Sequence, residues 1–262
     1  MKKNICLLLT LFVAIFSYGQ NLVPEDDNKS ALYGLGKTGV GAGIPRDSIR
    51  VIDYGNGNKY EGQVVNGHRN GYGVYIWADG NRYEGYWKDN VRKGYGVFTW
   101  ANGDKYEGEW EDDVQMGHGV FTWTNGDRYD GDWEDDRQNG YGRFIWANGD
   151  SYVGDWVDDI KNGHGVFTWV NGDSYDGDWK DDKMSGQGVF TWGEGSKWAG
   201  DKYSGSVVNG VKSGYGVYTW ADGKRFEGNW VNNMKHGRGI IYYSDGSSDE
   251  GFWYQDKYQG RN

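Results

Sequence analysis

The sequence has little cysteine, little proline and fewer basic than acidic residues. Its single cysteine, Cys6, lies in an apolar run at the N-terminus, so the rest of the chain cannot form a disulfide. Both prolines, Pro24 and Pro45, precede the stretch that contains all 15 tryptophans. The 28 basic and 38 acidic residues give a formal net charge of -10, which repels nucleic acid and anionic membrane surfaces. We therefore expect no nucleic-acid partner, and membrane lipid is a disfavoured one.

Residues 1–20 have the pattern of a secretory signal peptide. Lys2 and Lys3 form a basic start, an apolar run extends over residues 5–16, and a short small or polar exit follows. A membrane anchor is the alternative, but the run is short for crossing a bilayer. We expect export to the periplasm, the cell surface or the medium. Loss of the two lysines would change the formal charge to -12, from 26 basic and 38 acidic residues.

Residues 21–49 show neither helix nor strand periodicity and are rich in Gly, Pro and Asp, which predicts a flexible linker. Within it, residues 31–38 (ALYGLGKT) match a relaxed phosphate-loop pattern. A phosphate loop needs a buried strand before it and a helix after it. The flanking residues are polar on one side and glycine-rich on the other, so we interpret the match as chance and expect no nucleotide cofactor.

Glycine and aromatic residues are abundant and occur at a fixed spacing of 23 residues. In each unit a tyrosine is followed two residues later by glycine, and in five of six units a tryptophan follows after two more. A short repeat that cannot bury its own surface must stack on its neighbours. Nothing in the repeats has helical spacing. The repeated tyrosines are Tyr60, Tyr83, Tyr106, Tyr129, Tyr152 and Tyr175.

Each unit reads as two strands, for example residues 106–110 and 117–123, followed by an Asn-Gly or Asp-Gly turn signal. Side chains alternate between faces along a strand, so the aromatic residues and glycines share one face and the acids take the other. The glycines leave room for rings to lie flat across the sheet. The predicted fold is all-β: an elongated, twisted, single-layer antiparallel sheet of stacked 23-residue β-hairpins.

The same alternation predicts a register for the hairpin. Pairing Trp110 with Gly117 across a six-residue loop places Tyr106 opposite Phe121, so that the aromatic sets of both strands coincide. The turn that contains Asn125 must then have an odd number of residues. Loops of three and of five residues both satisfy this condition.

The repeat array extends over residues 50–262, with about eight full repeats and one irregularity. After Tyr175 the next matching position is Trp198, but the phase starts again at Tyr203. This predicts a five-residue insertion near residues 197–202. We interpret it as a bulge or lengthened turn; the alternative is a bend that shapes a local site.

The motifs YEGEW, GHGVFTW and TNGD at 23-residue intervals resemble MORN repeats (membrane occupation and recognition nexus). The resemblance covers residues 50–262. It implies an elongated, twisted antiparallel sheet of stacked hairpins and a non-enzymatic role in protein–protein assembly or scaffolding. Phospholipid binding, which has been proposed for such repeats, is disfavoured here by the acidic charge.

Paired acids recur in the hairpin loops and could form a row along one edge. Ca²⁺ takes six to eight oxygen ligands, so two acids per loop would suffice only if neighbouring loops converged. We favour a solvated acidic edge, with no metal and no cofactor. The four histidines (His68, His118, His164, His236) stand singly, and no nucleophile with an ordered base is indicated, so we predict no catalytic residue. The paired acids are Asp112-Asp113, Asp135-Asp136, Asp158-Asp159 and Asp181-Asp182.

The aromatic face is the candidate binding surface, because contiguous apolar surface rimmed by acids marks interaction sites. Most of its rings should also pack on one another, since a single-layer sheet has no second layer. The predicted function is a non-enzymatic scaffold that binds protein, including itself, outside the cytoplasm; a glycan-binding or cell-surface module is the alternative. The candidate residues are Tyr83, Trp87, Phe98, Trp100, Tyr106, Trp110, Phe121, Trp123, Tyr129, Trp133, Phe144, Trp146, Tyr152, Trp156, Phe167, Trp169, Tyr175 and Trp179.

Overall fold

The computed structural model describes residues 49–261, so the predicted signal peptide and nearly all of the predicted linker lie outside the described residues. The described part contains 19 strands and no helix, and it therefore offers no helix that could cross a membrane. The strands are β1 (Ile49–Asp53), β2 (Lys59–Val65), β3 (His68–Ile76), β4 (Arg82–Lys88), β5 (Val91–Thr99), β6 (Lys105–Glu111), β7 (Val114–Thr122), β8 (Arg128–Glu134), β9 (Arg137–Ile145), β10 (Ser151–Val157), β11 (Ile160–Thr168), β12 (Ser174–Lys180), β13 (Lys183–Thr191), β14 (Lys202–Val208), β15 (Val211–Thr219), β16 (Arg225–Val231), β17 (Met234–Tyr242), β18 (Ser248–Tyr254) and β19 (Lys257–Gly260).

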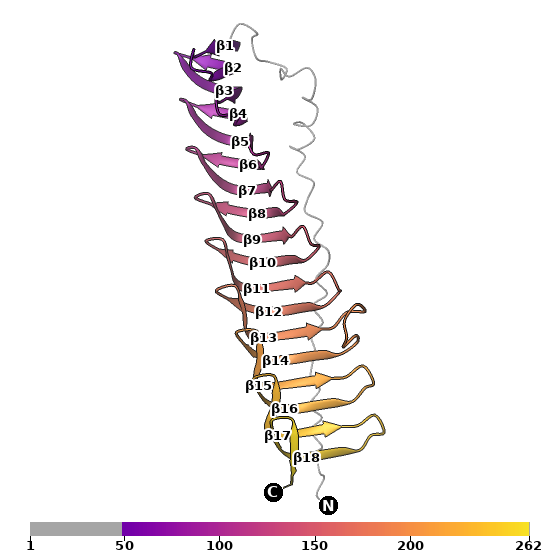
Figure 1. Ribbon diagram of the computed structural model, residues 1–262. Helices are drawn as coiled ribbons and strands as arrows, with labels where there is room; N and C mark the ends of the chain where they lie inside the picture. Colours follow the sequence, from indigo (N-terminus) through magenta and orange to yellow (C-terminus); the bar gives the residue numbers. More distant parts are fainter. Residues whose placement is uncertain (1–48, 262) are drawn as a thin grey trace, which may run out of the picture. The chain divides into compact units, whose positions relative to one another are not determined.

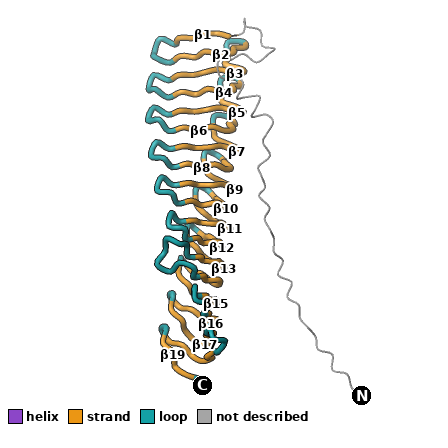
Figure 2. Tube along the Cα trace, turned by 90° about the vertical axis from the view of Figure 1, so that its right-hand side faces the viewer, coloured by secondary structure: helices purple, strands orange, loops and turns teal. Residues whose placement is uncertain are grey.

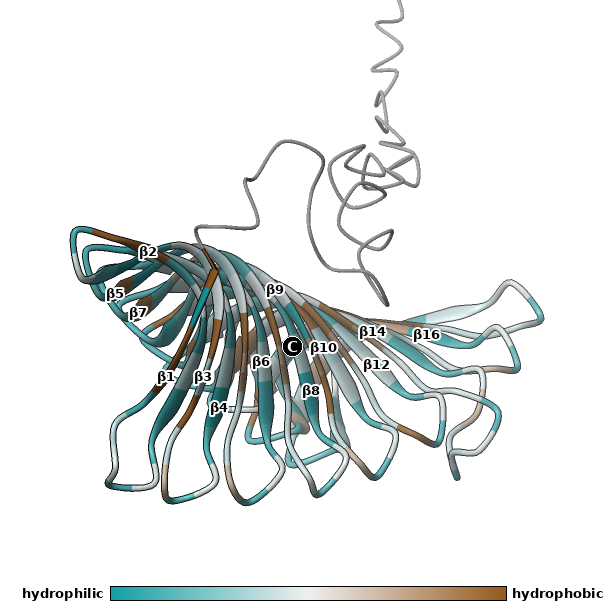
Figure 3. Cartoon of the chain, turned by 90° about the horizontal axis from the view of Figure 1, so that it is seen from above, coloured by the Kyte–Doolittle hydropathy of each residue, from teal (hydrophilic) through white to brown (hydrophobic). Residues whose placement is uncertain are grey.

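Each strand pairs antiparallel with the next along the chain, which makes one open meander (Figure 1). The predicted all-β sheet of stacked hairpins is confirmed. Seen along the array, the strand direction turns progressively from β1 to β16, as expected of a twisted sheet (Figure 3). The connecting loops stack along the two edges (Figure 2).

The first hairpin turn of each repeat is shorter than predicted. In the β6–β7 hairpin only Asp112 and Asp113 connect the strands, and both have left-handed backbones with φ of 47° and 72°. Two consecutive residues with positive φ are typical of a type I′ turn, which Asp and Asn tolerate. The predicted six-residue loop was wrong because the second strand starts at Val114, three residues before Gly117.

A β-bulge in the middle of this hairpin explains how both strands can be longer. The predicted pairing of Tyr106 with Phe121 is confirmed. The register then shifts between Gly108 and Glu109, so that Trp110 pairs with Gln115 and not with Gly117. The predicted Trp110–Gly117 pair was therefore wrong.

The second turn is a five-residue loop, which decides between the two predicted lengths. Thr122 pairs with Arg128, and the Trp123 N–H donates to the Asp127 carbonyl across the loop (3.0 Å). Between β13 and β14 the corresponding N–H, from Trp192, donates to the carbonyl of Asp201 (3.1 Å). The five additional residues lie in this one loop, and Tyr203 resumes the repeat opposite Phe190.

The core is a single layer of rings on one face of the sheet. The Tyr106 ring lies across Gly108 and Gly119, where a Cβ added to Gly119 would be 2.3 Å from the tyrosine oxygen. Its hydroxyl donates to the Glu109 carbonyl at the bulge (3.0 Å). The Trp110 indole N–H donates to the carbonyl of Gly96 in the preceding repeat (3.3 Å). Tyrosine, glycine and tryptophan thus connect each repeat to the one before it.

The opposite face is polar and ion-paired. His118 Nε2 lies 3.0 Å from the Asp130 carboxylate, which also accepts from Arg128 at 2.7 Å. The His118 hydrogen bond and the Arg128 contact lower the pKa of Asp130 to about 2, against the opposing effect of its partial burial. His164 and Asp176 repeat this contact at 3.1 Å. This face is therefore organised by local pairs between neighbouring strands.

Candidate functional site

The main concave feature is an open groove on the aromatic face, which we call the central groove. It has a volume of 830 Å³ and extends over successive repeats, from Arg92 on β5 to Asp182 at the β12–β13 turn. Aromatic rings form its floor and polar side chains of the turns form one edge. The rings include Phe121, Trp123, Trp133, Phe144, Trp146 and Trp156.

The predicted binding residues divide into groups according to their burial. The five tyrosines (Tyr83, Tyr106, Tyr129, Tyr152, Tyr175) are 0% exposed and do not line the groove. Five tryptophans are also buried, with edge-on contacts to the tyrosines: Trp87, Trp110, Trp133, Trp156 and Trp179. The five tyrosines stabilise the ring layer from within. Contacts with a ligand in the groove must therefore come from the tryptophans and phenylalanines that line it.

The remaining rings stand closer to the groove surface. Phe98 is buried, whereas the others are half-buried and packed against the core. In these four repeats the phenylalanine and the following tryptophan form a tilted pair, as Phe121 and Trp123 do with centroids 4.3 Å apart. These rings offer a firm apolar surface along the array. The half-buried members are Trp100, Phe121, Trp123, Phe144, Trp146, Phe167 and Trp169.

One further position of the repeat, which the sequence reasoning missed, lines the central groove in four repeats, as Arg92, Gln115, Gln138 and Lys161. It is the second residue of each nine-residue strand, and we call it the ladder position. It precedes the first strand glycine by two residues and so lies on the same face as the glycines and the rings. The signal was the alternation itself, which continues past Gly117 to Gln115. The ladder residues are Arg69, Arg92, Gln115, Gln138, Lys161, Met184, Lys212 and Lys235.

The second acid of each turn pair holds the ladder residue of the preceding repeat by its backbone. Asp136 Oδ1 accepts from the Gln115 N–H (2.7 Å), and the Asp136 N–H donates to the Gln115 carbonyl (3.2 Å). Asp159 does the same for Gln138. Asn90 accepts the equivalent bond from Arg69, so the contact needs a side-chain oxygen and not a charge. Among the described residues no group of three or more acids, histidines or cysteines could hold a metal ion.

A second hollow, the C-terminal groove, lies beside the inserted loop and has a volume of 580 Å³. Its lining includes Lys212 and Lys235, together with Trp198 from the insertion. In the first repeat after the insertion, which also supplies Lys212, Val207 replaces the buried tryptophan and Gly210 replaces the second turn acid. The insertion therefore falls where the regular ring pattern is interrupted.

An open sheet of stacked β-hairpins with a continuous aromatic groove defines a β-hairpin repeat protein, an architecture that fits a scaffold for interactions. The MORN-repeat model matches residues 60–82, 83–105, 106–128, 129–151, 152–174, 175–197, 203–225 and 226–248. The chain belongs to the MORN-repeat family. The gap after residue 197 coincides with the inserted residues.

Comparison with curated proteins gives no match. Among solved structures, the chain is similar to the TCP10 domain of Danio rerio CPAP, with 11% identity, a TM-score of 0.45, and coverage of 81% of this chain and 96% of that one. It is also similar to the Drosophila melanogaster SAS-4 TCP domain, determined in complex with a proline-rich motif of Ana2. That match has 14% identity, a TM-score of 0.29, and coverage of 80% and 94%. The family assignment rests on the repeats.

Proposed function

We propose that this protein is a non-enzymatic scaffold that binds protein partners along the central groove and acts outside the cytoplasm. The observation that carries the proposal is the groove itself: a continuous row of half-buried rings, open to solvent, with polar turns along one edge. Apolar surface rimmed by polar groups is typical of protein interaction sites.

The organisation of the chain supports binding over catalysis. Each repeat presents nearly the same side chains, so a partner can contact several repeats at once and gain affinity from many small contacts. The layer under the groove is rigid, because its tyrosines and tryptophans are hydrogen-bonded within and between repeats. A preformed surface loses little conformational entropy on binding.

The test is affinity capture of the full exported chain from its own cells, repeated with Trp123→Ala/Trp146→Ala. Both rings are half-buried at the groove surface. Tyr141→Ala/Tyr215→Ala is the matched control, since each of these tyrosines is 59% exposed on the opposite face. We expect the partner to be lost with the tryptophan pair only. Retention of the partner by both variants, or recovery of polysaccharide without protein, would reject the proposal.

A further inference from the structure

The ladder position carries a cation at both ends of the central groove. The Arg92 guanidinium lies 4.2 Å from the centroid of Trp110, and the Lys161 ammonium lies 5.5 Å from that of Trp179. Each cation is also ion-paired with the second acid of the next turn: Arg92 with Asp113 at 2.9 Å and Lys161 with Asp182 at 3.0 Å. At these two repeats a cation thus occupies the space between an indole ring and a carboxylate.

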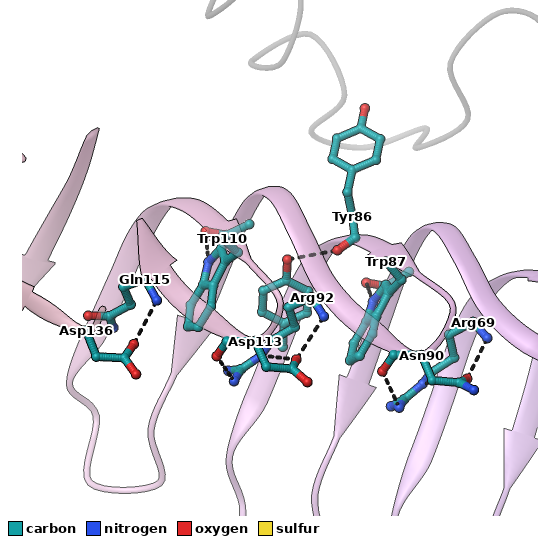
Figure 4. Close-up of polar contacts among 12 residues, drawn as sticks. Arg69, Tyr86, Trp87, Asn90, Arg92, Trp110, Asp113, Gln115 and Asp136 are labelled. Atoms are coloured by element: carbon teal, nitrogen blue, oxygen red, sulfur yellow. Dashed lines mark hydrogen bonds and ion pairs between the residues drawn. The ribbon is translucent and has the colours of Figure 1, made fainter. Parts of the chain in front are cut away.

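In the two repeats between them the ladder position carries no cation, although the Lys161 ammonium also lies 5.9 Å from the centroid of the Trp156 ring. The ladder residues are the neutral Gln115 and Gln138, which are only 5% and 6% exposed. Their backbones are still held by Asp136 and Asp159, so the turn geometry is unchanged. Figure 4 shows Gln115 beside Asp136 at the place that Arg92 and Asp113 occupy one repeat earlier.

We call the region around these two glutamines the gap. Three kinds of group in it, namely two carboxylates, one indole ring and two side-chain amides, lack a partner of the kind that the neighbouring repeats provide. Within residues 49–261, no cation lies within ion-pairing distance of the exposed Asp136 and Asp159 carboxylates, and none lies over the Trp133 ring. The side-chain amides of Gln115 and Gln138 make no hydrogen bond within that part of the chain, although both side chains line the groove. Trp253 Nε1 is the one buried side-chain polar atom that lacks a partner within residues 49–261, so the two amides are not sealed from solvent and can be reached by a ligand in the groove.

We propose that this gap, which lies within the groove assigned above to protein binding, takes two basic side chains of an extended partner segment, placed three residues apart. Each Arg or Lys would enter between Trp133 and Asp136, or between Trp156 and Asp159, as Arg92 does between Trp110 and Asp113. The two glutamine amides would bond the main chain of the segment, since an amide both donates and accepts. The proposal rests on the proposed function, and it names the chemistry of the partner.

The spacing follows from the geometry of the sheet. One repeat adds two strands, which advances the array by roughly 9.6 Å. Three residues of polyproline II helix cover roughly 9.3 Å, and their backbone has no internal hydrogen bonds, which leaves it free to bond to the glutamines. An α-helix would need a non-integral number of residues, about 6.4, to cover one repeat. An extended segment with basic residues at i and i+3 therefore matches both repeats at once.

Binding of synthetic peptides to the full exported chain, measured by calorimetry, tests the proposal. The probe is a peptide of Pro-Pro-Arg units, and the two control peptides are one with Glu in place of Arg and one with the two Arg four residues apart. We expect the three-residue spacing to bind at least about tenfold more tightly than either control. Equal binding at both spacings would overturn the proposal, because it would reflect only the acidic charge of the chain.

Two pairs of substitutions complete the test: one places cations in the gap, and the other removes the negative charges of its carboxylates. Gln115→Arg/Gln138→Lys places in the gap the residues found on either side of it, and Asp136→Asn/Asp159→Asn keeps the backbone contact as Asn90 does. Both pairs should weaken the Arg peptide about tenfold or more. Asp135→Asn/Asp158→Asn, on the first residues of the same turns, removes the same charge outside the gap and should change binding less than about twofold.

Failure of this proposal can be told apart from failure of the proposed function. If the cellular partner is lost with Trp123→Ala/Trp146→Ala but retained by Gln115→Arg/Gln138→Lys, the groove binds protein and the gap does not bind its basic residues. If the peptides show the expected spacing dependence and no cellular protein is captured, the gap recognises basic segments without the proposed scaffold role.

Discussion

The central and C-terminal grooves lie on the same sheet face and are built from equivalent strands of different repeats, yet the charged groups without an ion-pair partner have opposite signs in the two grooves. In the central groove Asp136 and Asp159 have no cation beside them, because the ladder residues are glutamines. In the C-terminal groove the ladder residue Lys212 has no carboxylate, because Asn233 occupies the turn position and accepts the Lys212 N–H at 2.8 Å. Among the described residues no acid lies within ion-pairing distance of Lys212.

The contacts that form the sheet are shared by the two grooves, whereas the charged side chains that line them differ. Where the turn residue is Asp or Asn the same backbone contact is made, and in both grooves the rings belong to one core cluster, in which Val207 replaces a tryptophan. The charge of a groove is set by one ladder residue and one turn residue per repeat. A repeat can therefore change what its groove binds without changing its fold.

The largest difference should come from the buried ring below each groove. Trp156→Ala removes a ring that is 4% exposed and contacts Tyr129 and Tyr152, and we expect a loss of about 4 kcal/mol in the free energy of unfolding. Val207, 1% exposed, occupies this position beside the insertion, and Val207→Ala should cost about half as much, because fewer atoms are removed. Urea denaturation of both variants measures the difference. Equal losses of unfolding free energy in the two variants would show that the size of the buried side chain at this position does not determine the stability of the array.

The glycines below the rings should give the next largest effect. A Cβ at Gly142 would lie 2.3 Å from the Tyr129 oxygen, so Gly142→Ala must displace a fully buried ring, and we expect a loss of about 3 kcal/mol. Gly223 is a control with open space around its Cβ and φ of +86°, where alanine should cost about 1 kcal/mol through backbone strain alone. Thermal denaturation compares the two. A smaller loss at Gly142 than at Gly223 would contradict the close packing of tyrosine on glycine.

Most of the sheet and its ring layer could be predicted from the sequence. Strand alternation places Tyr106, Gly108 and Phe121 on one face, and this does not depend on the lengths of the loops. The bulge at Glu109 could not be predicted, since it changes the pairing and leaves the residue pattern of the face intact. Without it, Asp112-Asp113 cannot be recognised as a two-residue turn. The positions next to that turn were therefore assigned to a loop.

The ladder position was harder to recognise than the rings for a related reason. Its residue type changes from Arg to Gln, Lys and Met along the array, so it gives no repeating letter in the sequence. Its role depends on the partner that the next turn supplies, and that turn lies 21 residues further on, as from Gln115 to Asp136. Only the folded stacking of repeats brings the two together.

The unpaired lysine of the C-terminal groove should make stability depend on pH. Burial lowers the pKa of Lys212 to about 8, whereas the unfolded lysine titrates near ~10.4. Between these values the unfolded state binds more protons, so the contribution of Lys212 to stability rises as the pH increases from 8. Below pH 8 the full penalty of burying the cation applies. Lys212→Met, which copies Met184, should therefore stabilise the chain by about 1 kcal/mol at pH 7, after allowance for its partial exposure.

Chemical denaturation at pH 7 and pH 9.5 checks this expectation. The gain from Lys212→Met should shrink at the higher pH, where the wild-type lysine is already neutral when folded. The buried tyrosines do not interfere, because burial raises the pKa of Tyr60 and Tyr175 to about 12 and both chains share them. A gain of equal size at both pH values would assign it to apolar packing and not to charge.

The smallest effect should come from placing a cation at the ladder position within the gap of the central groove. Gln138→Lys would place an ammonium over Trp156 and beside Asp159, as Lys161 lies beside Asp182 one repeat on. Because Asp159 is exposed, the expected gain in the free energy of unfolding is only about 0.5 kcal/mol. The gain should fall when Asp159→Asn is added, although Asp159→Asn alone changes stability little, since an asparagine keeps the backbone bond. A double-mutant cycle of these two substitutions measures the coupling. Zero coupling would mean that the lysine does not interact with Asp159. A cation at position 138 would then not adopt the arrangement that Lys161 and Asp182 have one repeat on.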